Sequence, residues 1–167
     1  MHIGRLFFIV SAIAVAVTSF AAGCSTKYIP HTAIEDTPRN REVVDLIERY
    51  RQALQARDTN AILSLASNKY YDNSGTASPK DDIDYKGLKQ FLADHLNKVQ
   101  ASQVDFRVEQ VIEDEDNENK LYVEYRYVSR YQLEMPSGQQ QWHVDPDVRD
   151  RLTLIKEGGD WRILSGL

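Results

Sequence analysis

The sequence of 167 residues contains a single cysteine, Cys24. One thiol cannot form a disulfide within the chain or supply the cysteine sets of structural zinc sites, so we expect packing alone to hold the fold. Lysine and arginine number 20 against 25 acidic residues, and they form no block or stripe. Because nucleic-acid-binding proteins carry such basic patches, we expect no nucleic-acid partner.

Motifs of several common enzyme classes are missing as well. The sequence has no glycine-rich phosphate loop, no Gly-x-Ser-x-Gly elbow and no His-Glu-x-x-His pair. Asp114, Asp116 and Glu118 lack the glycine and the terminal glutamate of a calcium loop, so they predict a solvated hairpin loop. We therefore expect no metal ion and no cofactor.

Long apolar runs are absent except for one near the start, from Leu6 to Val17, which is broken by a single serine. It follows Arg5 and leads to small residues, an arrangement typical of a secretory signal. The segment Ala21-Ala22-Gly23-Cys24 resembles the lipobox of bacterial lipoproteins, although alanine stands at 21 where that family prefers leucine.

This resemblance implies that residues 1–23 are a signal peptide that is removed and that acyl chains such as palmitate are attached at Cys24. Ser25 follows the cysteine, where aspartate typically retains lipoproteins in the inner membrane. We therefore expect the periplasmic side of the outer membrane, with the outer face of the cytoplasmic membrane as the alternative. An ordinary cleaved signal with an incidental cysteine and an uncleaved anchor remain open. The acidic composition predicts membrane contact through lipid alone.

Residues 24–38 are predicted to be the acylated cysteine and a short polar tether, and residues 39–167 a single domain. Thr37-Pro38 predicts the start of a first helix, which ends near Arg57. Asp58 or Thr59 is expected to cap a short second helix, and Asp84 a third. The residues expected to face inward are Val43, Leu46, Ile47, Tyr50 and Leu54 in the first helix, Ile62, Leu65 and Ala66 in the second, and Leu88, Phe91, Leu92, His95, Leu96 and Val99 in the third.

From residue 104 onward the apolar period changes from about 3.6 to about 2, which predicts β-strands. The third of these strands begins at Trp142 and is interrupted at Asp145-Pro146-Asp147, which predicts a turn or a bulge. Trp161, in the closing strand, is expected to be buried against the first helix near Tyr50 or Leu54. Helices followed by an antiparallel meander predict an α+β domain.

The order of these elements resembles the nuclear-transport-factor-2-like superfamily, which includes ketosteroid isomerase, scytalone dehydratase and polyketide cyclases. The likeness rests on Ala56-Arg57-Asp58 after the first helix, the apolar Ile62-Leu63-Ser64-Leu65, and the closing hairpin Gly159-Asp160-Trp161-Arg162-Ile163. It spans roughly residues 39–167. It implies three N-terminal helices packed on a curved, cone-like antiparallel sheet with a cavity on the concave face.

His95 is the strongest candidate for chemistry in such a cavity, because it lies on the apolar stripe of the third helix. A histidine there can transfer protons near neutral pH; the alternative is a core histidine with one hydrogen bond. Asp72 lies in an aromatic loop that can rim the cavity and pair with His95. Its alternative role is that of an Asx-turn residue.

Four tyrosines complete the expected pocket with His95: Tyr50, Tyr70, Tyr125 and Tyr127. Their hydroxyls can donate hydrogen bonds to a ligand oxygen; the alternative is packing. The sequence favours a membrane-anchored periplasmic lipoprotein whose non-catalytic domain binds a partner protein or a small apolar ligand. The alternative is a small cavity enzyme of the isomerase, dehydratase or cyclase type, using His95 with Asp72 or a tyrosine.

Overall fold

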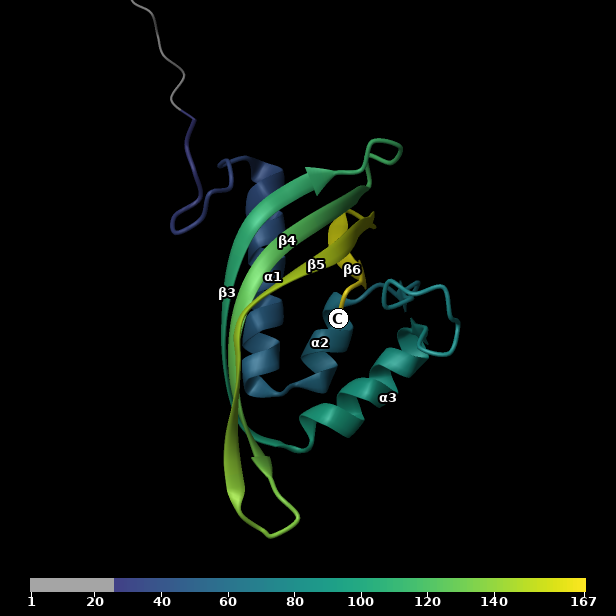
Figure 1. The fold of residues 1–167 in the computed structure, drawn as a ribbon. Coiled ribbons are helices and arrows are strands. Elements are labelled where there is room, and N and C mark those ends of the chain that lie inside the picture. Colours follow the sequence, from purple (N-terminus) through teal and green to yellow (C-terminus); the bar gives the residue numbers. More distant parts are fainter. Residues whose placement is uncertain (1–25) are drawn as a thin grey trace, which may run out of the picture.

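The structure, a computed structural model, describes residues 26–167, so Cys24 and the expected signal segment lie outside the described residues. The described chain is an α+β fold in which three helices precede a curved four-stranded antiparallel sheet (Figure 1). The elements are α1 (Pro38–Ala56), α2 (Thr59–Leu65), β1 (Tyr71–Asp72), β2 (Ile83–Asp84), α3 (Tyr85–Leu96), β3 (Val99–Glu113), β4 (Lys120–Glu134), β5 (Gln140–Glu157) and β6 (Asp160–Ser165). None of the described helices is both long and apolar enough to cross a membrane.

Each helix begins at a capping side chain. Thr37 accepts a hydrogen bond from the backbone N–H three residues later, and Pro38 occupies the first turn. Asp58 and Asp84 cap α2 and α3 in the same way, which confirms the predicted caps. Helix α1 ends where Arg57 adopts a left-handed conformation with φ 57°.

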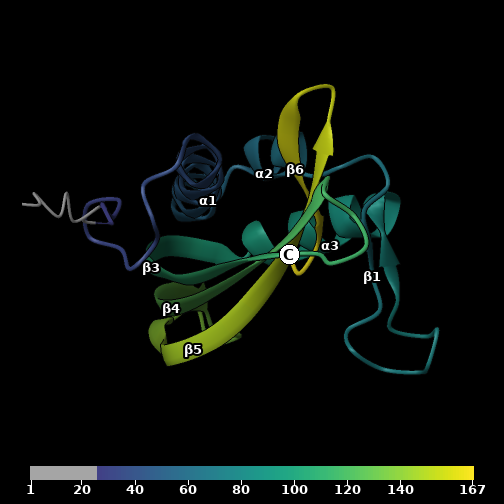
Figure 2. The same cartoon turned by 90° about the horizontal axis from the view of Figure 1, so that it is seen from above.

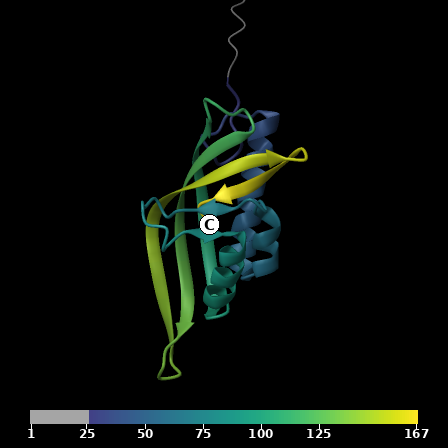
Figure 3. The same ribbon diagram turned by 90° about the vertical axis from the view of Figure 1, so that its right-hand side faces the viewer.

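The four long strands follow one another in the sheet in the order β3-β4-β5-β6, while β1 and β2 pair separately. Seen from above, α1 runs alongside β3 (Figure 2). The turn between β4 and β5 extends beyond α3 (Figures 1 and 3). This leaves the first half of β5 and the end of β4 without a helix that packs closely over the concave face.

The main core lies between the helices and the concave face of the sheet. The residues in it with the least exposure include Val43, Leu46 and Ile47 of α1, Ile62 of α2, Leu88 of α3, Leu121 and Val123 of β4, Leu152 and Leu154 of β5, and Ile163 of β6. Ile34 also belongs to this core, with 5% of its surface exposed. The folded part therefore includes residue 34 in addition to the expected 39–167.

One expectation about the core needs correction. Helix α3 buries only Leu88 and Leu92, while Phe91 and His95 are exposed and Val99 begins β3. The last turn of α3 lies over the cavity described below rather than over packed side chains, so helical spacing does not lead to burial there.

Trp161 is buried as predicted, with 6% of its surface exposed. The Lys156 ammonium lies 5.3 Å from the centre of its ring, and Glu42, Asp45 and Arg49 of α1 line the same surface recess. Trp161 therefore packs against the first half of α1.

Candidate functional site

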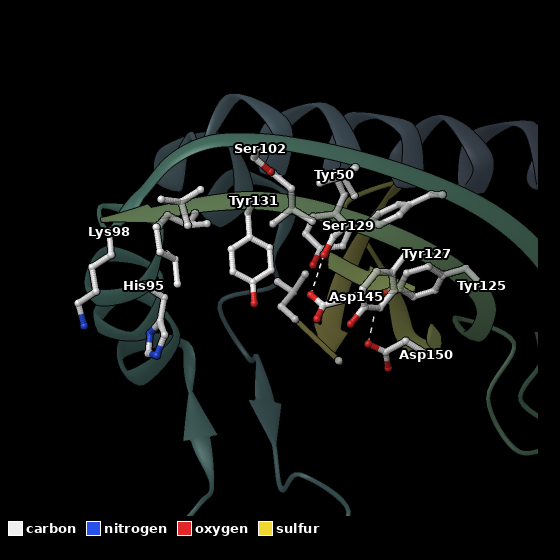
Figure 4. A pocket seen from close by; sticks show the side chains of 18 residues that line it. Tyr50, His95, Lys98, Ser102, Tyr125, Tyr127, Ser129, Tyr131, Asp145 and Asp150 are labelled. Carbon is white, nitrogen blue, oxygen red and sulfur yellow. Dashed lines mark hydrogen bonds between the residues drawn. The ribbon is translucent and has the colours of Figure 1, made fainter. Parts of the chain in front are cut away.

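A cavity of about 500 Å³ opens between α1, the end of α3 and the concave face of β3, β4 and β5 (Figure 4). Its lining is mostly apolar or aromatic. It comprises Tyr50, Leu54, His95, Leu96, Lys98, Val99, Ser102, Val104, Phe106, Tyr125, Tyr127, Ser129, Tyr131, Leu133, Asp145, Asp150, Gly166 and Leu167. The lining residues that belong to β4 stand at every second position of that strand, because alternate side chains of a strand share one face of the sheet.

Four aromatic rings form a connected cluster at the cavity wall. The Phe106 ring centre lies 5.5 Å from Tyr50, 4.9 Å from Tyr125 and 6.1 Å from Tyr127. Phe106 and Tyr127 are paired across β3 and β4, and Tyr50 reaches them from α1. Tilted rings at these distances attract one another, so the wall is well ordered before any ligand enters.

Tyr50 brings an unused polar group to this wall. Only 7% of its surface is exposed, and its hydroxyl has no hydrogen-bond partner among residues 26–167. Burial raises the pKa of the Tyr50 phenol, and the negative charge of Asp150 raises it further. The phenol therefore keeps its proton at neutral pH and can donate it to a ligand.

Two carboxylates of β5, Asp145 and Asp150, lie at the same cavity. Asp145 accepts a hydrogen bond of 2.7 Å from the Ser129 hydroxyl, and Asp150 accepts one of 3.4 Å from the Tyr125 hydroxyl. Asp150 is exposed, but the protein packed around its carboxyl still raises its pKa. Burial raises the pKa of the Tyr125 phenol as well.

A β-bulge explains why both carboxylates face the same way. Residues five positions apart in a regular strand point to opposite faces. In the β4–β5 ladder Tyr127 pairs with Val148 and Ser129 with Asp145, so β5 contains one extra residue at this point. Asp147 within the bulge has φ 51°. The bulge predicted at Asp145-Pro146-Asp147 is thus confirmed, and it turns Asp145 toward the cavity.

The structure places His95 at one end of the cavity, beside Lys98 (Figure 4). Its ring stacks on Phe91 with centroids 4.1 Å apart, and its Nδ1 lies 2.8 Å from the Phe91 carbonyl oxygen. The expectation of a buried core histidine is wrong, because the side chain is exposed.

Asp72 does not pair with His95, which corrects the expected acid/base pair. Its carboxylate accepts hydrogen bonds from the backbone N–H of Ser74 at 2.8 Å and of Gly166 at 2.7 Å. The first bond is that of an Asx turn, and the second ties the last residues of the chain to β1. Asp72 does not belong to the cavity wall.

Tyr70, like Asp72, makes structural contacts and is not part of the cavity wall. Only 2% of its surface is exposed, and its hydroxyl accepts a hydrogen bond of 3.0 Å from the backbone N–H of Leu167. Burial raises the pKa of the Tyr70 phenol. Tyr70 therefore positions Leu167, which lines the cavity, and is not itself a lining residue. The other expected pocket residues, Tyr50, Tyr125, Tyr127 and His95, do line it.

Sequence reasoning misses both cavity carboxylates. The sequence presents Asp145 only as part of a turn or bulge, and Asp150 belongs to no motif. The available signal for Asp150 is its spacing from Leu152 and Leu154, which places the three residues on one face of β5.

No family model matches the sequence, and no curated protein sequence matches it. Solved structures do match. One is described as a putative scytalone dehydratase from Novosphingobium aromaticivorans, with 11% identity over 77% of this chain and 80% of that chain and a TM-score of 0.59.

Two further structures are similar. Aln2 from a Streptomyces species has 14% identity over 79% of this chain and 90% of that chain, with a TM-score of 0.55. A variant of a protein named Rd1NTF2_05 has 12% identity over 77% of this chain and 96% of that chain, with a TM-score of 0.51. These likenesses show that the chain has the scytalone-dehydratase-like, nuclear-transport-factor-2-like fold, and fold alone does not assign a function.

Proposed function

We propose that this domain binds a small, mostly apolar ligand in its cavity without catalysis, and that lipid on Cys24 anchors it at the periplasmic side of the outer membrane. The observation that carries the binding function is the cavity itself, about 500 Å³ in volume and walled mainly by apolar and aromatic side chains. Sites for small molecules typically have volumes of about 300–1,000 Å³ and a few well-placed polar groups in an apolar wall.

The aromatic wall supplies most of the binding energy in this proposal. A ligand that covers the rings of Phe106, Tyr125 and Tyr127 removes apolar surface from water, at about 25 cal/mol for each Å². The Tyr50 hydroxyl then orients the ligand by donating a hydrogen bond to it. A protein partner in the envelope is the alternative occupant of the domain.

The anchor proposal rests on the lipobox-like sequence before Cys24 and agrees with the position of the first described residues. The start of the described chain, in purple, and the loop between β3 and β4 lie at one end of the molecule, and the turn between β4 and β5 lies at the other (Figure 1). A lipid on Cys24 would thus hold the β4–β5 turn away from the bilayer. Acyl chains contribute about 0.8 kcal/mol per buried methylene, so two or three chains make a durable anchor.

The second candidate function is a cavity enzyme of the isomerase, dehydratase or cyclase type. The contact between Asp150 and Tyr125 favours it, because a carboxyl with a raised pKa beside a phenol can act as an acid/base group. The scytalone dehydratase description of one similar structure is consistent with this class. Asp150 takes the role that the sequence suggested for His95 with Asp72.

A fluorescence titration tests the binding proposal. The chain from residue 26 to 167 is suitable, because every residue of the core cluster lies within it. N-phenyl-1-naphthylamine, a neutral apolar dye, is expected to brighten on binding. Ser102→Phe fills the cavity and should abolish the signal, whereas Gln103→Phe, at the exposed neighbouring position, should leave it unchanged. Equal signals from the two variants would show that the dye binds elsewhere.

A third variant separates binding from catalysis. If the domain is an enzyme, Asp150→Asn removes turnover of the substrate while dye binding persists. If the domain only binds ligand, Asp150→Asn and the parent protein differ in affinity alone.

A further inference from the structure

The acidic residues around the bulge of β5 have different partners on the two faces of the sheet. On the convex face, Glu109 forms ion pairs with Arg126 and Arg149, and Asp147 pairs with Arg126 at 2.6 Å. On the concave face, Asp145 and Asp150 form no ion pair with any described residue. Their recorded partners are a serine hydroxyl, a tyrosine hydroxyl and one backbone N–H.

Asp145 is half-buried and Asp150 is exposed, and both line the cavity without a basic partner. Asp147 stands two residues from Asp145 and pairs with an arginine, so the two sides of this segment of β5 differ in their ion pairs. Carboxylates that line a cavity without a basic partner are available to pair with a positive group of a ligand.

The walls around these carboxylates suit the same kind of ligand. The faces of aromatic rings carry partial negative charge and attract cations, most strongly where water is excluded. Tyr125, Tyr127, Tyr131 and Phe106 all line the cavity. The side chain of Tyr50 is buried and its hydroxyl has no hydrogen-bond partner among the described residues; a hydroxyl can accept as well as donate, so its oxygen can turn toward a positive group.

The basic groups of the wall lie elsewhere. Lys98 and His95 stand at one end of the cavity, and Asp145 and Asp150 lie toward the other (Figure 4). The carboxylate end therefore keeps its negative character.

We propose that the ligand is an apolar organic cation, in which an ammonium or similar charged nitrogen carries an aromatic or alkyl body. The charge lies among Asp145, Asp150 and the tyrosine rings, and the apolar body lies along β3 and α1 toward Leu54 and Val99. This inference rests on the proposed function, because it assigns a chemical class to the ligand of the same cavity.

A matched pair of probes isolates the contribution of charge. Phenyltrimethylammonium and tert-butylbenzene have nearly the same shape and differ in the central nitrogen or carbon. Calorimetric titration of the 26–167 chain should show at least tenfold tighter binding of the cation. The difference should shrink as salt concentration rises. Equal affinity for the two probes, or binding of the neutral probe alone, would overturn the inference.

Three isosteric variants of β5 test the two cavity carboxylates and supply a matched control. Asp145→Asn and Asp150→Asn should each weaken binding of phenyltrimethylammonium by at least about fivefold and change the affinity for tert-butylbenzene less than twofold. Asp147→Asn should change neither, because its carboxylate pairs on the convex face. An equal loss of cation affinity in all three variants would indicate a general surface-charge effect and contradict the inference.

The outcomes also distinguish this inference from the proposed function. If the naphthylamine dye and tert-butylbenzene bind but the cation does not, only the cation assignment fails. If neither the dye nor the two probes bind, both proposals fail. Thermal melts of each variant show whether a loss of cation affinity is caused by unfolding. The two probes, titrated into the parent protein, test the cationic nature of the ligand without any variant.

Discussion

The Tyr125 hydroxyl donates a hydrogen bond of 3.4 Å to Oδ2 of Asp150, its direct partner across the β4–β5 ladder. The two groups lie at the cavity wall, and the protein around them raises the pKa of both. This cross-strand pair therefore brings a carboxyl and a phenol together at the wall of a largely aromatic cavity.

The raised pKa of Asp150 predicts a pH-dependent effect on stability. The folded chain holds the proton more tightly than the unfolded chain, whose aspartate titrates near 3.8. Ionisation of Asp150 thus lowers the free energy of unfolding as pH rises above that value. Asp150→Asn should raise stability at about pH 7 by less than about 1 kcal/mol, since solvent screens the partly exposed charge. Melts between about pH 3 and 8 should show this gain vanishing in acid.

The control for this series is Asp147→Asn. It removes one exposed ion pair with Arg126 and should lower stability slightly, by about 0–1 kcal/mol. A gain from Asp150→Asn that persists unchanged below about pH 3.5 would contradict the assignment to ionisation.

The two tryptophans should differ strongly in their contribution to stability. Trp161 is 6% exposed and Trp142 is 50% exposed. Trp161→Ala should lower the free energy of unfolding by about 3–5 kcal/mol. Trp142→Ala should change it by no more than about 0.5 kcal/mol. Urea denaturation of the two variants checks both values, and similar midpoints would show that Trp161 is not part of the packed core.

His95→Leu is expected to leave the fold intact. The imidazole is exposed, and its contacts, with the Phe91 ring and the Phe91 carbonyl, lie within its own helix. The free energy of unfolding should change by no more than about 0.5 kcal/mol. A loss above about 1 kcal/mol in chemical denaturation would indicate a structural partner beyond α3.

Gly166 and Gly138 form a matched pair for substitution by alanine. Both have positive φ, of 95° and 78°, so each alanine carries backbone strain. At Gly166 a Cβ would also lie 2.3 Å from the Arg151 carbonyl oxygen, while Gly138 has open space. Gly166→Ala should therefore destabilise by about 1–3 kcal/mol more than Gly138→Ala. Equal melting temperatures of the two variants would show that the backbone at residue 166 moves away from the Arg151 carbonyl without a cost in stability.

Cys24→Ser tests the lipid anchor. The variant should keep its signal segment, gain no acyl mass and stay out of the outer-membrane fraction, because serine cannot form the thioether. Mass spectrometry and fractionation of the membranes check this result. A variant that matures and gains mass as the parent does would contradict lipidation, and recovery of the parent in the inner-membrane fraction would contradict the outer-membrane location.

Local signals in the sequence were sufficient for most of the fold. The capping side chains Thr37, Asp58 and Asp84 act on backbone groups within three residues, so a short stretch of sequence specifies each helix start. The exposure of His95 follows from a property with no local signal, namely that the sheet and α1 leave a cavity under the last turn of α3. Helical spacing identifies a face but not the depth of packing beneath it.

The cavity carboxylates were harder to predict for a related reason. Alternation assigns faces along a strand only while the strand is regular. The extra residue near Pro146 exchanges the two faces, so Val144 is 53% exposed and Asp145 faces the cavity. The sequence indicates an interruption at Asp145-Pro146-Asp147, but the number of extra residues, which decides the faces, depends on the pairing with the neighbouring strand.

The same bulge determines how this chain has to be aligned with others of its fold. Before Pro146 the odd-numbered residues of β5, such as Asp145, face the cavity; after Asp147 the even-numbered ones, such as Asp150, do so. At the 7–15% identity of the similar structures, an alignment relies on strand periodicity more than on residue matches. A comparison without a one-residue gap at this point will equate Asp145 with outward-facing residues, and the cavity-facing positions of other proteins with this fold will be assigned to the wrong face of the strand.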